Sequence, residues 1–115
     1  MADIHLDPDV LSALREVMED EYPDLLETFL RDSEERLSDL RKAKDASRFM
    51  NAAHSFKGSS SNMGAVRLAK LCHELEQCAK ERKMADIEKL LEKIDSEFAI
   101  IRPLYEAERQ RSLSG

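Results

Sequence analysis

Apolar residues recur at intervals of three and four along almost the whole chain, which is the spacing of one face of an α-helix. The pattern is clearest at Leu26, Phe29, Leu30, Leu37 and Leu40. No segment alternates apolar and polar residues over the length of a strand, and the 115 residues include only three glycines and three prolines. Because helix interiors disfavour glycine and proline, we expect an all-α fold.

Capping residues and prolines divide this pattern into five helical elements. We expect them to begin near Asp7, Tyr22, Asp45, Ala65 and Ile87. The second helix should end near Lys44, the third should fray around residues 62–64, and Pro103 can kink the last one. Four helices of roughly 15–20 residues fit an antiparallel up-down-up-down bundle, with the first short helix packed across one end. Residues 1–108 should form a single domain and residues 109–115 a flexible tail.

Charge and hydropathy limit the classes of partner. Eighteen Lys and Arg against 24 Asp and Glu leave a formal charge of −6, whereas binding to nucleic acid needs clustered positive charge. The longest apolar run, Phe98 to Ile101, is far shorter than the roughly 20 residues that cross a bilayer. The N-terminal residues lack the basic start and apolar stretch of a secretory signal. We therefore expect a cytoplasmic protein that binds neither nucleic acid nor membrane.

The third helix carries a histidine on its outer face. At about 100° per residue, Phe49, Ala53 and Phe56 share a narrow arc that must face the core. His54 falls well outside that arc and Lys57 lies on the adjacent stripe, so both should reach solvent. A neutral imidazole there offers a lone pair to an electrophilic phosphorus, and the ammonium group attracts phosphoryl oxygens. This helix places no acidic residue one turn from His54, so the chain should hold a phosphoryl group rather than hydrolyse it.

The residues that follow are unusually small for a helix that only packs. Gly58, Ser59, Ser60 and Ser61 succeed Lys57, and glycine costs about 1 kcal/mol in a helix interior relative to alanine. Gly58, one turn after His54, removes a side chain that would obstruct a partner's approach. On the inner side, Ser60 allows a neighbouring helix to pack closely and can bond its hydroxyl to the carbonyl four residues back.

The run from His54 to Ala65 resembles the signature of histidine-containing phosphotransfer (HPt) domains, H-x-x-K-G-S-S-x-x-x-G-A. The continuation Leu68-Ala69-x-x-Cys72-x-x-Leu75-Glu76 is similar to the next helix of that family. The resemblance implies a freestanding HPt protein of the bacterial type, a four-helix bundle, and phosphorylation of His54 on its ε2 nitrogen. It also implies that Lys57 contacts the phosphate, that Gly58 permits close docking, and that Mg²⁺ belongs to the receiver partner, so this chain needs no cofactor or metal.

We therefore expect a phosphorelay intermediate that is not itself an enzyme. It would accept a phosphoryl group from the receiver aspartate of a hybrid sensor kinase and pass it to the receiver of a response regulator. The docking face should surround His54 and include Met50, Asn51, Gly58 and Ser61, and this mostly polar face is consistent with a monomer. The alternative is a phosphorylation-independent helical adaptor in which His54 is incidental.

Three other activities fit the residues less well. Three glycines cannot build an ATP-binding glycine-rich loop, so kinase activity is not expected. The serines after Gly58 lie too far from His54 for a hydrolase and lack a G-x-S-x-G sequence. Cys72 and His73 diverge on their helix, and the spacing of Cys72 and Cys78 does not suit a disulfide, so we expect reduced thiols and no zinc site.

Overall fold

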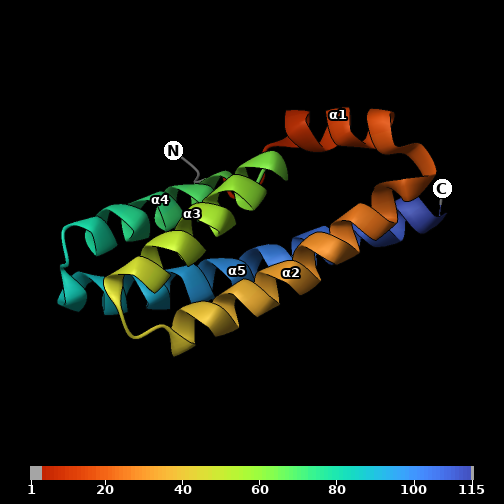
Figure 1. The fold of residues 1–115 in the computed structure, drawn as a ribbon. Coiled ribbons are helices and arrows are strands. Elements are labelled where there is room, and N and C mark those ends of the chain that lie inside the picture. The colour runs from red at the N-terminus through yellow and green to blue at the C-terminus, as the bar shows by residue number, and fades with distance from the viewer. Residues whose placement is uncertain (1–3, 115) are drawn as a thin grey trace.

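The computed structural model describes residues 4–114 and contains helices joined by short connections (Figure 1). The elements are α1 (Pro8–Met18), a 3₁₀ turn η1 (Glu19–Glu21), α2 (Tyr22–Lys42), α3 (Ala46–Asn62), α4 (Val66–Lys80) and α5 (Met84–Ser114). Within residues 4–114 there is no strand, which confirms the all-α prediction. Two starts follow from capping: the side chains of Asp7 and Asp45 accept backbone N–H bonds of 2.9 Å at α1 and α3.

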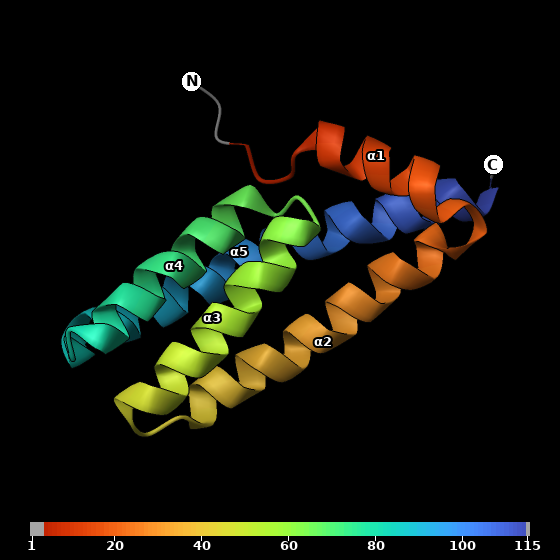
Figure 2. The same cartoon turned by 45° about the horizontal axis from the view of Figure 1, so that its top comes forward.

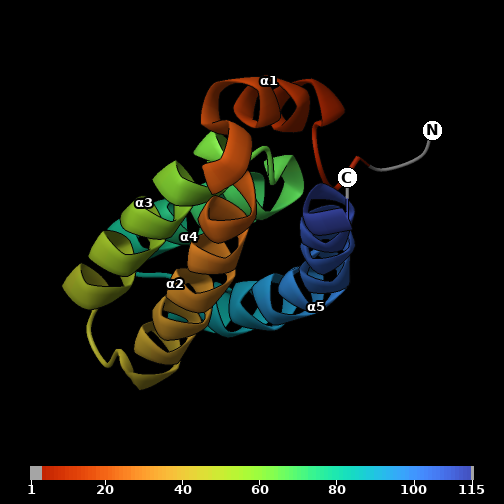
Figure 3. The same ribbon diagram turned by 90° about the vertical axis from the view of Figure 1, so that its right-hand side faces the viewer.

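The helices α2 to α5 run alternately up and down, so neighbours along the chain are antiparallel (Figures 1 and 2). Helices α3 and α4 pack closely on one another, and α5 packs against both α2 and α4. The longer α2 and α5 project beyond the other pair, and α1 lies across that end of the bundle (Figure 3). The predicted four-helix bundle with an extra N-terminal helix is therefore confirmed.

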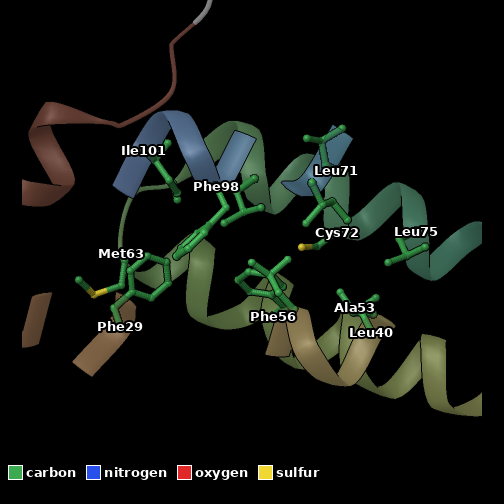
Figure 4. Close-up of a cluster of buried hydrophobic side chains, with 14 of the residues drawn as sticks. Phe29, Leu40, Ala53, Phe56, Met63, Leu71, Cys72, Leu75, Phe98 and Ile101 are labelled. Carbon is green, nitrogen blue, oxygen red and sulfur yellow. The ribbon is translucent and has the colours of Figure 1, made fainter. Parts of the chain in front are cut away.

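One core joins the four bundle helices (Figure 4). Each contributes fully buried apolar side chains: Leu26 and Leu40 in α2, Phe56 in α3, Leu68 and Leu75 in α4, and Ile94 and Ile101 in α5. Burying one such side chain contributes roughly 1.5–3 kcal/mol. Most of the stability of helices in proteins comes from tertiary packing, so the shared core fixes where α3 and α4 present their outer faces.

The connection between α3 and α4 is a tight, fully hydrogen-bonded turn rather than the frayed end that the sequence predicts. Gly64 has a φ of +75°, its N–H donates to the Ser61 carbonyl at 3.1 Å, and the N–H of Ala65 donates to the Ser60 carbonyl at 2.9 Å. These two bonds define a Schellman motif, which needs a left-handed residue and favours glycine there. A Cβ on Gly64 would also lie 3.1 Å from the Cβ of Val10 in α1.

Two further hydrogen bonds fasten this turn to the rest of the fold. The buried hydroxyl of Tyr105 in α5 donates to the Met63 carbonyl at 2.6 Å, and the N–H of Asp7 donates to the Gly64 carbonyl at 2.8 Å. Burial of Tyr105 raises the pKa of its hydroxyl, which keeps it protonated as a donor. The turn therefore holds α3 and α4 in one fixed relative position.

Helix α5 is longer than predicted. It has 31 residues and continues through Pro103 to Ser114, whereas the sequence suggested a flexible tail over 109–115; residue 115 lies outside the described residues. Pro103 is exposed and so is Ala99, whose carbonyl loses its partner, so water can satisfy that group. Arg109 donates to Glu27 of α2 at 3.4 Å, which ties the last turns to the bundle. No helix within residues 4–114 has the length and apolarity needed to cross a bilayer.

Candidate functional site

His54 stands on the outer face of α3. The same helix buries Phe49, Ala53 and Phe56 on its inner face, as the helical wheel predicts. The side chain of His54 is 70% exposed. An imidazole in this position can be reached by another protein without any rearrangement of the bundle.

A carboxylate from the neighbouring helix holds the imidazole. Glu76 of α4 is only 8% exposed, and its Oε2 lies 2.7 Å from Nδ1 of His54. Its other oxygen, Oε1, accepts a hydrogen bond of 2.8 Å from Nζ of Lys57. One buried carboxylate therefore joins the two side chains that the sequence singled out.

The charge state of Glu76 determines which imidazole nitrogen carries the proton. The hydrogen bond from Lys57 is the largest influence on the pKa of Glu76 and lowers it; burial acts against this, and the bond from His54 lowers it again. The pKa therefore lies below its ordinary value, so Glu76 is ionised at neutral pH and can only accept hydrogen bonds. Nδ1 of His54 must then carry the proton, which leaves the lone pair of a neutral imidazole on Nε2.

The side chain of Lys57 is partly buried close to the imidazole of His54. Its side chain is 29% exposed, and its ammonium group is anchored by Glu76. The bond to Glu76 therefore fixes the position of the ammonium group, one helical turn from His54. Phosphoryl oxygens brought to the imidazole would meet this positive charge.

His73 and the two cysteines lie in different surroundings. Nδ1 of His73 lies 4.0 Å from Oε1 of Glu76, and more than half of its side chain is exposed. Cys72 is buried, which raises the pKa of its thiol to about 12, and it is not paired with Cys78. Within residues 4–114, no group of three or more His, Cys, Asp or Glu side chains could hold a metal ion.

The residues predicted for the docking face lie along α3 with different accessibility. Asn51 and Ser61 are exposed, whereas Met50 is half-buried and packs against the core. Gly58 is exposed, and a Cβ added to it would meet no atom within 4 Å. The fold therefore does not require glycine at this position. The effect of the glycine is to leave open space on the surface of α3.

Two hydrogen bonds on α3 differ from the sequence interpretation. The buried hydroxyl of Ser60 has no partner among the described residues, so the predicted bond to the carbonyl four residues back is wrong. Ser59 makes a bond of this kind instead, donating to the Phe56 carbonyl at 3.2 Å. In addition, Arg36 of α2 donates to Oγ of Ser55 at 2.6 Å, the residue that follows His54 in the sequence.

Sequence reasoning missed the role of Glu76. It considered only carboxylates on the same helix as His54, and α3 indeed supplies none. The available signal was the position of Glu76 itself, because it directly follows the buried Leu75 and lies four residues after the buried Cys72. A carboxylate at the edge of an apolar stripe is rarely buried unless it is paired.

Known proteins resemble this chain over most of its length. The family model of the Hpt domain matches residues 24–108. The chain is 25% identical over 104 residues to "Histidine-containing phosphotransfer protein 2" of Arabidopsis thaliana, covering 82% of this chain and 67% of that protein. It is also similar to the crystal structure of histidine-containing phosphotransfer protein B (HptB) from Pseudomonas aeruginosa PAO1, with a TM-score of 0.92 and 53% identity, covering 96% and 98% of the two chains.

The matched segment begins in α2 and contains all of α3 and α4, with His54, Lys57 and Glu76. Phosphocarrier function, rather than enzymatic activity, follows from this match. The chain belongs to the Hpt domain family of histidine phosphotransfer proteins.

Proposed function

We propose that Nε2 of His54 accepts a phosphoryl group from the receiver aspartate of a hybrid sensor kinase and delivers it to the receiver of a response regulator. The single observation that carries this proposal is an exposed imidazole whose Nδ1 is bound by the buried Glu76. That contact orients the ring and leaves Nε2 as the nucleophile. Membership in the Hpt family supports phosphotransfer as the reaction. The two receiver partners are what we add to it.

The transfer balances without a further reactant. The lone pair of Nε2 attacks phosphorus, and the bond between phosphorus and the aspartyl oxygen breaks, so the carboxylate leaves with its electron pair. His54 becomes a positively charged phosphoimidazole that still carries its proton on Nδ1. Glu76, 2.7 Å away, compensates this charge, and Lys57 faces the phosphoryl oxygens. The reverse sequence delivers the group to a second aspartate.

The same arrangement explains why the protein should carry the group rather than hydrolyse it. A hydrolase needs a base that activates water near the phosphorus atom. Glu76 is the nearest carboxylate partner of His54, and it is bound on the Nδ1 side of the ring, opposite Nε2. It is also occupied by Lys57. The phosphoryl group on Nε2 should therefore be removed by transfer to a partner's carboxylate rather than by hydrolysis.

Gly58 suits this surface to a protein partner. Two proteins that exchange a phosphoryl group must bring their reacting atoms to near contact, so positioning supplies much of the rate. The open space above Gly58, one turn from His54, lets the partner's backbone approach the helix. A rigid outward helix face is well suited to this task, since the aspartate of a receiver must reach the imidazole.

Transfer of labelled phosphate from a purified phosphorylated receiver tests the proposal. We expect acid-labile label on the wild type and none on His54→Gln. His5→Gln is a matched control, because Nδ1 of His5 also lies 2.7 Å from a buried carboxylate, that of Glu97, and it should keep the label. Receiver binding without any label on the wild type would instead support the adaptor alternative, and label on His54→Gln would refute the proposed acceptor.

A further inference from the structure

A groove runs along the surface between α4 and α5. Its wider part has a volume of about 530 Å³ and is lined mainly by α4, with Lys93 from α5 and Ile4 from the N-terminal segment. A second hollow of about 400 Å³ shares Glu74 and Lys93 with the first, so the two adjoin, and it is also lined by Asp86 and Lys89. In the described part of the chain, neither His54 nor Glu76 lines it.

The floor of this groove is apolar, and part of it is exposed. Val66 and Leu71 of α4 line the wider part and Leu90 of α5 lines the second hollow. Val66 is 40% exposed and Ile4, at the end of the groove, is 63% exposed. Leu71 and Leu90 are only 9% and 7% exposed, so Val66 and Ile4 provide most of the apolar surface that a bound partner would cover.

The rim of the wider part is cationic in a chain whose net charge is −6. Lys70 projects from α4 and Lys93 from α5, and within residues 4–114 neither forms an ion pair. Arg67 adds a third positive charge, although Glu97 already lies 3.4 Å from its Nε. Glu74 is the single carboxylate that lines this part, so positive charge prevails.

The N-terminal segment closes one end of the groove. Nδ1 of His5 lies 2.7 Å from Oε2 of the buried Glu97 in α5. This contact fixes the residue next to Ile4, so the apolar end wall is in place before any partner binds. A preformed wall reduces the ordering cost of binding.

We propose that this groove binds an acidic amphipathic helix of a protein partner. The apolar face of that helix would cover Val66, Leu71 and Leu90, and its carboxylates would face Lys70 and Lys93. Insertion of an amphipathic helix into an apolar groove is a general mode of recognition, and charge complementarity selects an acidic one. The α4 wall from Val66 to Cys78 extends about 18 Å at 1.5 Å per residue, which matches a partner helix of roughly three turns.

Neither His54 nor Glu76 lines the proposed surface, and the nearest approach to the phosphotransfer site is through His73, which lines the second hollow and lies 4.0 Å from Oε1 of Glu76. The test uses two three-turn peptides with the same leucine stripe, one flanked by glutamates and one by lysines. We expect only the acidic peptide to bind, and to shift the backbone amide resonances of Val66, Lys70, Leu71 and Lys93 in the isotope-labelled protein. The amide of His54 should not move.

Charge reversal completes the test. Lys70→Glu combined with Lys93→Glu should weaken binding of the acidic peptide about tenfold or more. Lys42→Glu combined with Lys44→Glu, which makes the same change in net charge near the end of α2, should leave binding unchanged. Phosphotransfer by both double variants should equal that of the wild type, so a failure of the proposed function would be seen separately.

Three results would overturn the proposal. The two peptides could bind equally well, the control double variant could weaken binding as much as the groove variant, or the acidic peptide could produce no shifts. Inorganic phosphate alone is the remaining probe. If it produced the same shifts, with the same loss on charge reversal, the groove would be assigned to a small anion instead of a helix.

Discussion

Replacing Glu76 with glutamine should slow phosphorylation of His54 without unfolding the protein. The carboxylate accepts from both Nδ1 of His54 at 2.7 Å and Nζ of Lys57 at 2.8 Å. A glutamine amide has one oxygen and one NH₂ group, so it can accept from only one of these donors at that position. It also cannot neutralise the positive charge that forms on the phosphorylated imidazole.

The expected size of the effect follows from these contacts. A hydrogen bond to a charged group contributes roughly 1.5–3 kcal/mol, and one between neutral groups about 0.5–1.5 kcal/mol. A loss of about 1–1.5 kcal/mol in the transition state corresponds to phosphorylation that is about five- to tenfold slower. The loss should be largest for the fully formed phosphoimidazolium, so the equilibrium should also shift toward the aspartyl phosphate of the receiver.

Stability should change much less. The side chain of His54 is mostly exposed and that of Lys57 is partly exposed, so both can be rehydrated when the charge is removed. Pairs of this kind contribute about 0.2–1 kcal/mol. The far-ultraviolet circular dichroism of Glu76→Gln should therefore match that of the wild type, and its free energy of unfolding at neutral pH should fall by no more than this amount.

The assay is single-turnover transfer from a phosphorylated receiver, measured in both directions. Glu97→Gln is the matched control, because Glu97 is a buried carboxylate that binds His5 with the same 2.7 Å distance. We expect wild-type transfer in this control. A wild-type rate in Glu76→Gln, or an equal loss in Glu97→Gln, would refute the role that we assign to Glu76.

Three further predictions concern the docking surface, the turn and acid stability. Gly58→Glu should fold normally, since an added Cβ meets no atom within 4 Å, but should transfer more slowly; unchanged transfer would remove Gly58 from the docking face. Gly64→Ala should lower the free energy of unfolding by about 1–2 kcal/mol, because its φ is +75° and its Cβ would lie 3.1 Å from that of Val10; an unchanged urea midpoint would contradict this. Folding lowers the pKa of Glu76 below its ordinary 4.5. The ionised carboxylate therefore adds to the free energy of unfolding above pH 4.5, and this addition is lost as the pH falls through the folded-state pKa. Between neutral pH and about pH 3, the urea midpoint should therefore fall more in the wild type than in Glu76→Gln. Equal decreases in the two proteins would count against the coupling.

The orientation of His54 could be predicted from the sequence because it is a local property. A residue's direction on a helix depends only on its offset from the buried positions, here Ala53 and Phe56. The start of the helix at Asp45 was predictable for the same reason, since capping involves the next few residues. These predictions required no knowledge of how the helices pack.

The contact between His54 and Glu76 could not be derived in this way. It depends on how α3 and α4 cross, which is set by the left-handed turn at Gly64 and by the hydrogen bond from Tyr105. The course of α5 beyond residue 108 depends likewise on partners distant in sequence, such as Glu27. Each of these features joins segments that a periodicity argument treats separately.

Two histidine–carboxylate pairs in this fold share one geometry, and we expect only one of them to accept phosphate. Nδ1 lies 2.7 Å from a buried carboxylate in both His54 and His5. The second oxygen of each carboxylate faces a cation, at 2.8 Å for Glu76 and 3.4 Å for Glu97. The difference is access: the side chain of His54 is 70% exposed on a helix face with open space above Gly58, whereas that of His5 is 28% exposed. The same polar contact therefore fastens a terminal segment to α5 in one place, and in the other we expect it to prepare a nucleophile for a partner, because there the imidazole is open to solvent.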